Sequence, residues 1–152
     1  MPNRETHAAI GIGAGTAATI FVAWEEPNFE QFCYVIGGAV GGYFGSSFPD
    51  LLEPADNPNH RKFFHSIVFN GLLAGSLFIS KILYSGARKI AKCGWDKMQT
   101  TENPIEKFFW WSCSVTVLVL AGAWTGMTVG YLSHVAADSM TAKSIPFLGI
   151  DF

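Results

Sequence analysis

The sequence predicts an all-α fold: a small polytopic membrane protein with about four transmembrane helices packed through Gly-rich faces, and a polar His/Asp site at one membrane face. Three observations predict this fold. Charged residues make up 14% of the chain, against about 25% in average soluble proteins. These charges are nearly absent from four long windows, and most of the sixteen glycines lie inside the windows. A length of 152 residues fits a single integral-membrane domain, 1–152.

The composition also excludes several classes of protein. Hydrophobic residues make up 49% of the chain and aromatic residues 14%, which is too many for a disordered protein. Ten Lys and Arg against twelve Asp and Glu leave a net charge of −2, and no basic patch indicates nucleic-acid binding. Cys33, Cys93 and Cys113 form neither a CxxC pair nor an even set, so a zinc ribbon and a disulfide-rich secreted fold are not expected.

The expected transmembrane helices, in order, are the windows 8–24, 31–49, 66–84 and 108–133. At a rise of about 1.5 Å per residue, a window of 17 to 19 residues spans about 26–28 Å, close to a hydrocarbon core of about 30 Å. The third window contains one charge, Lys81, and the fourth is 26 residues long, so it must tilt or leave the apolar layer. Arg4 before the first window also fits a signal peptide, but we expect a helix of the mature protein.

Between these windows we expect loops, among them a short acidic loop at 25–30 and a basic loop at 85–107. Trp110 and Trp111 follow the basic loop, where aromatic side chains anchor a helix at the membrane interface.

Every window carries glycines four residues apart. They are Gly11 and Gly15; Gly37, Gly41 and Gly45, with Gly38 and Gly42; Gly71 and Gly75; and Gly122, Gly126 and Gly130. Small residues at this spacing form a flat helix face on which a second helix packs closely within lipid. A compact soluble helical bundle is the alternative, which a mean hydropathy of +0.26 leaves open. The Gly-rich faces would serve packing within one chain or between chains of a homo-oligomer.

The four histidines share one predicted location. With four antiparallel spans, they fall on one membrane face together with four carboxylates: His7, His60, His65 and His134, with Asp50, Glu53, Asp56 and Asp138. Histidine and carboxylate together suit Zn²⁺, Mn²⁺ or Fe²⁺. A polar, titratable cluster at one end of a membrane bundle therefore indicates a functional site.

Taken singly, each of these residues also has a structural interpretation. His134 and Asp138 are four apart, so on a helix they would bind one ion together, or form a plain polar pair at the interface. His65 would be a metal ligand or a structural histidine at the start of a helix. Asp50 after Pro49 would be a ligand, a turn residue or a helix cap. His7 would be a ligand or simply a polar residue that begins the first helix.

Several sequence motifs follow one another along the chain. They are Thr6-His7, Phe48-Pro49-Asp50-Leu51-Leu52-Glu53-Pro54, His60-Arg61-Lys62-Phe63-Phe64-His65-Ser66, Gly130-Tyr131-Leu132-Ser133-His134-Val135-Ala136-Ala137-Asp138, and finally Thr141 with Ile145-Pro146-Phe147-Leu148. In this order, and over nearly the whole chain, they resemble the YdjM-like family of predicted inner-membrane, metal-dependent hydrolases. Many members carry a second carboxylate and a His directly after the Pro-Asp pair. Here Glu53 must replace them or one ligand is absent, which leaves the number of metal ions open.

The resemblance implies a multi-pass protein of the bacterial inner membrane with a divalent metal ion, Zn²⁺ first and Mn²⁺ second. We expect its ligands in the Pro-Asp, His-Arg…His-Ser and Ser-His…Asp motifs: His65, His134, Asp138 and Asp50, followed by His7 and His60. Glu53 is the candidate general base. Arg61 is the candidate to bind an anionic group, because a guanidinium binds phosphate or carboxylate through two hydrogen bonds, although it would also serve as a plain interfacial anchor.

The resemblance implies a metal-dependent hydrolase. Because a site at the membrane surface meets lipid head groups first, we expect hydrolysis of a phospholipid or another lipid-linked (phospho)ester by a metal-activated water. A metal with one open coordination position lowers the pKa of a bound water toward about 7. The alternative is a non-enzymatic membrane protein whose His/Asp cluster binds a metal or a proton for a structural, sensing or transport role.

The distribution of Lys and Arg predicts which side of the membrane holds the site. If Arg61 binds the substrate, it does not count toward topology. The site face then carries three basic residues and the opposite face six. Because basic residues are retained on the cytoplasmic side, we expect the basic loop in the cytoplasm and the His/Asp site outside it.

Overall fold

The computed structural model describes residues 4–24, 28–52 and 67–139, with side chains except those of 67–70 and 139. These residues form four helices: α1 (Arg4–Val22), α2 (Phe29–Leu52), α3 (Ile67–Thr100) and α4 (Pro104–Ser139). The described part of the chain contains no strand. The predicted all-α fold is therefore confirmed, and the four helices overlap the four expected windows.

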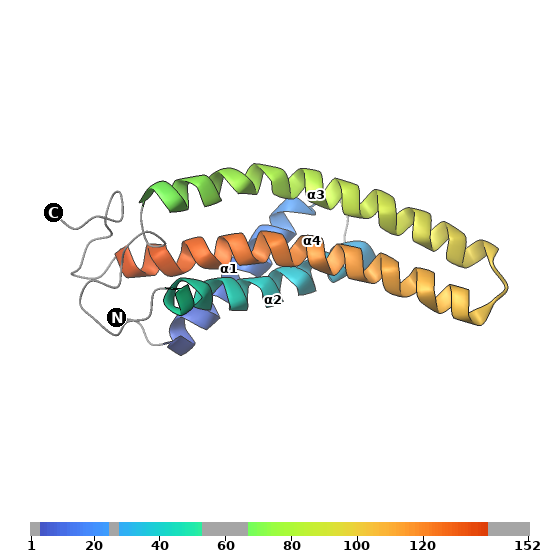
Figure 1. Ribbon diagram of the computed structural model, residues 1–152, viewed down its shortest axis with the longest axis horizontal. Coiled ribbons are helices and arrows are strands. Elements are labelled where there is room, and N and C mark those ends of the chain that lie inside the picture. Colours follow the sequence, from blue (N-terminus) through green and yellow to red (C-terminus); the bar gives the residue numbers. More distant parts are fainter. Residues whose placement is uncertain (1–3, 25–27, 53–66, 140–152) are drawn as a thin grey trace.

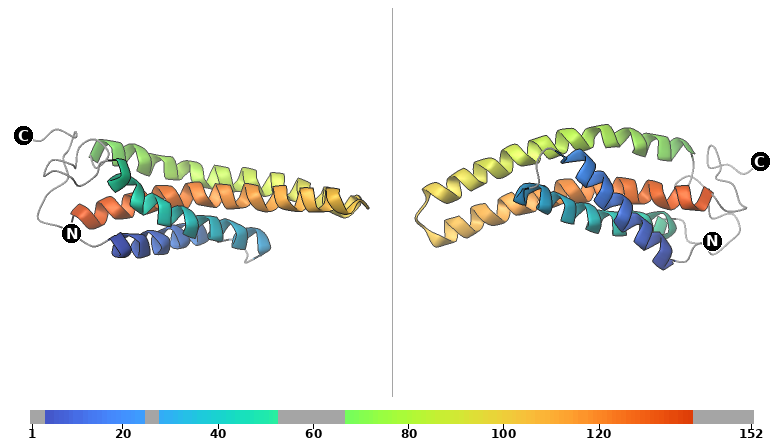
Figure 2. Two further views of the ribbon diagram at one scale, coloured as in Figure 1. Left: turned by 60° about the horizontal axis from the view of Figure 1, so that its bottom comes forward. Right: turned by 180° about the vertical axis from the view of Figure 1, so that it is seen from behind.

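The helices are of two lengths, and this sets the shape of the molecule. The long helices α3 and α4 form an antiparallel hairpin, and α1 and α2 cover only part of its length (Figure 1). Helix α2 packs most extensively on α4, and α1 crosses α2 and α4 obliquely (Figure 2). Helix α3 packs on α4 and has little contact with α1 and α2. The hairpin consequently projects beyond α1 and α2 at the end that carries residues 101–103.

The projecting hairpin corrects the prediction of a basic loop at 85–107. Helix α3 continues to Thr100 and α4 begins at Pro104, so the connection is only residues 101–103. Helices α3 and α4 continue into this region because they bury apolar side chains against each other: Ala87 and Ala91 of α3 pack with Leu118 of α4. At the connection, the Asn103 side-chain oxygen accepts a hydrogen bond from the Ile105 amide at 2.9 Å and so caps α4. Charge alone suggested a loop, but the charged residues lie on the outer faces of the hairpin.

Glycines bring α1, α2 and α4 into close contact. A Cβ atom added at most of the repeating glycines would overlap the backbone of a neighbouring helix: Gly11 and Gly15 of α1, Gly37, Gly41, Gly42 and Gly45 of α2, and Gly122, Gly126 and Gly130 of α4. A Cβ at Gly38 would overlap the Thr19 side chain. By contrast, nothing lies within 4 Å of a Cβ at Gly71 or Gly75 of α3. The Gly-rich faces of α1, α2 and α4 therefore serve packing within one chain.

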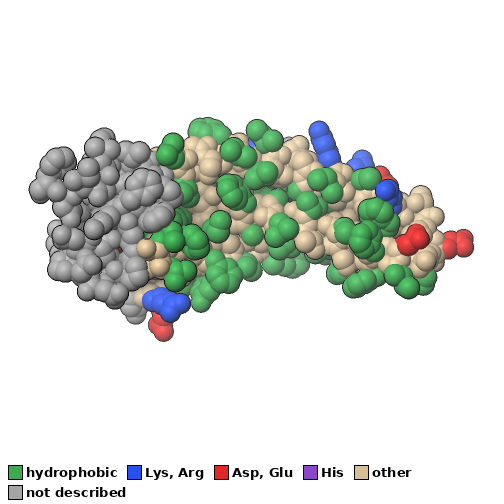
Figure 3. Space-filling model, in the orientation of Figure 1, with side chains coloured by type: hydrophobic (Ala, Val, Ile, Leu, Met, Phe, Trp, Pro, Cys, Tyr) green, Lys and Arg blue, Asp and Glu red, His purple; other side chains and the backbone are tan. Residues whose placement is uncertain are grey.

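Large apolar side chains lie mainly on the outside of the bundle. Phe21, Phe78 and Ile105, for example, are 81%, 86% and 78% exposed. Hydrophobic side chains are spread over the visible face, and the charged ones gather near its ends (Figure 3). Among the described residues, the segment Pro104–Asp138 of α4 is long and apolar enough to cross a membrane, judged by length and composition alone. Helices α1 and α2 are rich in Gly, with Ser and Thr, which add little apolar surface.

Candidate metal centre

Four polar side chains from three helices meet at one end of the bundle. His7 comes from α1, Asp50 from α2, and His134 and Asp138 from α4. His134 Nε2 lies 3.3 Å from Asp50 Oδ1 and 3.7 Å from Asp138 Oδ2. His7 Nε2 lies 3.5 Å from Asp138 Oδ1. The two imidazole rings stack with their centroids 4.1 Å apart.

Glycine contacts explain how the two histidines come together. Gly11 lies one turn after His7 on α1, and Gly130 lies one turn before His134 on α4. For both glycines, the nearest neighbouring atom to an added Cβ would be the carbonyl oxygen of Gly42 on α2. Because the three backbones approach so closely at this level, side chains one turn away can touch across the bundle.

The cluster is buried. His7 is 5% exposed, His134 1% and Asp138 1%. These three residues each offer one ligand atom, and the three atoms lie within 4.8 Å of one another. Asp50 differs because its side chain is 48% exposed, which places it between the buried cluster and the outside.

The donor set fits a divalent transition metal. Two imidazole nitrogens and carboxylate oxygens are the ligands that Zn²⁺, Mn²⁺ and Fe²⁺ take in proteins. At metal–ligand distances of about 2.0–2.1 Å, ligand atoms around a tetrahedral ion lie about 3.4 Å apart. His7 Nε2 and His134 Nε2 lie 3.5 and 3.7 Å from the two oxygens of Asp138, and the one ligand atom that each of these three residues offers lies within 4.8 Å of the other two. His7, His134 and Asp138 therefore lie close enough to hold a metal ion, with Asp50 beside them.

A cavity of about 670 Å³ opens next to the cluster. Its polar lining includes Arg4, His7 and Asp50. Most of the remaining lining is aromatic or apolar: Tyr43, Phe44, Phe48, Leu51 and Met127, with Ser46 and Ser47. The cavity therefore joins the polar cluster to an apolar surface formed largely by α2.

The structure brings together four of the residues that the sequence singled out, namely His7, Asp50, His134 and Asp138. Asp50 is part of helix α2 and contacts His134, so it is not a turn residue. His134 and Asp138 do share one face of α4, and they are buried instead of lying at the surface of the bundle. The other predicted site residues lie outside the described residues: Glu53, His60, Arg61 and His65.

By sequence, Arg4 fits a signal peptide and counts among the basic residues of the site face, and it is not among the predicted site residues, although it lines the cavity together with His7. The spacing between Arg4 and His7 could have indicated this. Arg4 and His7 are three residues apart, so in a helix that begins at Arg4 they lie on the same side.

The fold and the cluster define a class of protein: a small all-helical bundle with a buried His/Asp group at one end. The comparison of sequences specifies the family. The model of a family described as YdjM inner membrane protein matches residues 1–149, and the chain belongs to this family. No curated protein and no solved structure matches the chain significantly.

Proposed function

We propose that His7, His134 and Asp138, together with Asp50, bind a divalent metal ion, Zn²⁺ first and Mn²⁺ second. The observation that supports this proposal most directly is the buried set of three ligand atoms within 4.8 Å of one another. Burying two imidazoles and a carboxylate removes them from water at a cost in free energy, which coordination of a metal ion would offset.

We propose further that the protein is a hydrolase acting on a phospholipid or another lipid-linked (phospho)ester. The cavity supports this substrate class because it has a polar end at His7 and Asp50 and an aromatic, apolar lining along α2. Such a cavity suits a molecule with an anionic group and a hydrocarbon chain. A divalent ion bound at the cluster would supply a water whose pKa is lowered toward about 7.

The chain's own side chains have distinct roles in this proposal. Asp50 is half-exposed at the cavity and would accept a proton or orient a water there. The Arg4 guanidinium would bind the anionic group of the substrate through two hydrogen bonds. Glu53 as a base, Arg61 as a second anion-binding group and His60 and His65 as ligands remain part of the proposal, and they lie outside the described residues.

We propose four spans across the inner membrane, with the site on the extracytoplasmic side. The family description supports the membrane, and α4 supports one crossing by its length and composition. Exposed apolar side chains on α1, α2 and α3 support the remaining crossings, for example Phe21, Phe44 and Phe78. The side follows from the basic residues of the α3–α4 hairpin, which favour the cytoplasm.

Metal analysis of the purified protein tests the first part of the proposal. We expect about one equivalent of Zn or Mn in the wild type and almost none in the double variant His134→Ala, Asp138→Ala, because it removes two of the three buried donors. Asp96→Asn, an exposed carboxylate on the hairpin, is the control and should retain the metal. Stoichiometric metal in the double variant would disprove the assignment.

Lipid analysis tests the hydrolase. Cells that express the wild type should show a changed lipid or phosphoester product, and cells that express His134→Ala should not. Metal binding without any product would favour the alternative class, a structural, sensing or transport site. Near-complete burial of three donors is the observation that favours this alternative, because structural metal sites are closed to solvent.

A further inference from the structure

A second polar site lies at the opposite end of α1 from the metal cluster. It is a cavity of about 340 Å³ between the end of α1, the start of α2 and the middle of α3. Its lining comprises Val22, Glu30, Lys81, Tyr84, Ser85, Arg88, Lys89 and Lys92, and we call it the basic crevice. Val22 lies fifteen positions after His7 on α1, a distance of about 22 Å along the axis. The crevice therefore cannot share a ligand atom with the metal cluster.

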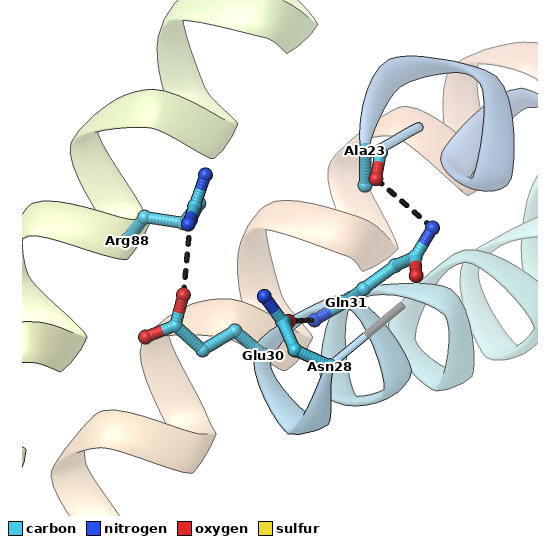
Figure 4. Close-up of polar contacts among 5 residues, drawn as sticks. All are labelled: Ala23, Asn28, Glu30, Gln31 and Arg88. Carbon is cyan, nitrogen blue, oxygen red and sulfur yellow. Dashed lines mark hydrogen bonds and ion pairs between the residues drawn. The ribbon is translucent and has the colours of Figure 1, made fainter. Parts of the chain in front are cut away.

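The crevice exists because α3 packs on α4 and barely touches α1 and α2. Where α3 does reach α2, the Arg88 Nε atom donates a hydrogen bond to Glu30 Oε2 at 2.9 Å (Figure 4). In the same region the Gln31 side chain donates to the Ala23 carbonyl at 2.9 Å, which ties the start of α2 to the end of α1 (Figure 4). The Tyr34 and Tyr84 rings add a buried contact with centroids 4.5 Å apart. These contacts hold the walls of the crevice in position.

The charge in the crevice is strongly positive. Among the described residues, four cationic side chains and one carboxylate line it, an excess of three positive charges. The carboxylate, Glu30, already binds Arg88. Within the part of the chain that the structure describes, Lys81, Lys89 and Lys92 form no ion pair with a carboxylate.

The cations also converge on one side of α3. Lys81, Arg88 and Lys92 are separated by seven and four residues, so they project from nearly the same face of the helix, the face that borders the crevice. Lys81 lies near the end of the apolar window 66–84, and the other cations of the crevice follow directly after this window on α3. The cations therefore occupy the level at which a membrane-spanning segment would meet the lipid head groups.

We propose that the basic crevice binds the phosphate group of an anionic phospholipid. Phosphate is the chemistry that several Lys and Arg donors recognise together. An anionic head group is the source that the position beside an apolar helix favours, because its acyl chains would lie along the exposed apolar side chains of α3, such as Phe78 and Ile82. This lipid would hold α3 against α1 and α2, where direct contact within the chain is slight.

Native mass spectrometry of the full-length protein in detergent tests this proposal. Phosphatidylglycerol, phosphatidylcholine and inorganic phosphate are titrated separately. We expect phosphatidylglycerol to bind more tightly than phosphatidylcholine. The double variant Lys89→Gln, Lys92→Gln should bind phosphatidylglycerol about 30-fold more weakly, since each lysine near anionic lipid contributes about 5-fold.

Two further variants make the test specific. Lys97→Gln with Lys107→Gln removes the same charge from the hairpin outside the crevice and should leave lipid binding unchanged. Glu30→Gln removes the negative charge but keeps a side-chain oxygen that can accept the hydrogen bond from Arg88 Nε, so the wall is retained and binding of phosphatidylglycerol should tighten. The metal content of all these variants should equal that of the wild type, so this result is independent of the proposed hydrolase.

Equal losses in both double variants, or equal affinity for the two lipids, would overturn the proposal, because general surface charge would then explain the binding. If inorganic phosphate binds and phosphatidylglycerol does not, the crevice is a site for free phosphate and the assignment to a lipid is wrong.

Discussion

Burial distinguishes the residues of the His/Asp cluster, His7, Asp50, His134 and Asp138, from one another. Asp138 is almost fully buried and contacts both His7 and His134. Asp50 contacts His134 and keeps about half of its side chain exposed at the cavity. A buried carboxylate between two imidazoles suits a permanent ligand, whereas an exposed one suits a group that meets substrate or water.

This difference predicts unequal effects of two matched substitutions. Asp138→Asn should weaken Zn²⁺ binding by about 100-fold or more, and Asp50→Asn by about 10-fold, because an amide is a poorer ligand and an outlying partner contributes less. Competition with a fluorescent zinc chelator measures both affinities, and a thermal melt of each variant checks its folding. An equal loss for Asp50→Asn would place the ion between Asp50 and His134 instead.

Among the elements, α2 is the helix that packs closely on two neighbours, α1 and α4. Its Gly37, Gly41 and Gly45 face α4, and its Gly38 and Gly42 face α1. Two stripes of glycine on one helix therefore allow two neighbours to pack closely at once. The polar contacts between helices are few and specific, such as the 2.7 Å hydrogen bond between the Tyr34 and Thr125 hydroxyls. Close backbone packing, more than large apolar side chains, forms the interior of this bundle.

Substitution of glycine by alanine tests this description with a control in the same chain. A Cβ at Gly41 would overlap the Ala123 carbonyl, so Gly41→Ala should destabilise the protein by about 1–3 kcal/mol through overpacking. At Gly75 nothing lies within 4 Å, and Gly75→Ala should stabilise α3 by up to about 1 kcal/mol through its higher helix propensity. Thermal unfolding in detergent measures both changes. A destabilised Gly75→Ala would indicate that this face of α3 packs on a second copy of the chain.

At the scale of the whole molecule, polar chemistry lies at both ends of α1. The His/Asp cluster lies at one end. The basic crevice lies at the other end, where the α3–α4 hairpin projects. If the helices cross the membrane as proposed, the two ends face different compartments. On that proposal, the basic residues favour the hairpin in the cytoplasm and the cluster outside it.

Cysteine labelling tests this orientation without foreign fusions. Cys93 is exposed on α3 and Cys113 is exposed on α4, whereas Cys33 on α2 is buried. In a Cys113→Ser variant, a membrane-impermeant maleimide should label Cys93 in inside-out vesicles but not in spheroplasts. Cys33 should react in neither preparation, which makes it the internal control. Labelling of Cys93 in spheroplasts would put the hairpin outside and the metal cluster in the cytoplasm.

Local patterns in the sequence were enough to predict four helices, their approximate positions and the family. Apolar windows, glycines at four-residue spacing and the Ser-His…Asp motif are properties of neighbouring residues along the chain, so they can be read without the fold. The same patterns predicted that His134 and Asp138 share a face. They could not show that α3 and α4 continue through 85–107, because charged outer faces resemble a loop when the opposite buried face is unknown.

The sequence by itself determined the helical class and the membrane family, since both depend on composition and on short spacings. Only the tertiary structure decided which residues meet. His7 and His134 are 127 positions apart, and their rings stack because Gly11 and Gly130 both pack against Gly42 on a third helix. Likewise, only helix packing places Arg4 beside the first cavity and places the lysines of α3 and Glu30 around the basic crevice. Contacts between distant segments depend on how helices approach one another, and no local pattern contains that information.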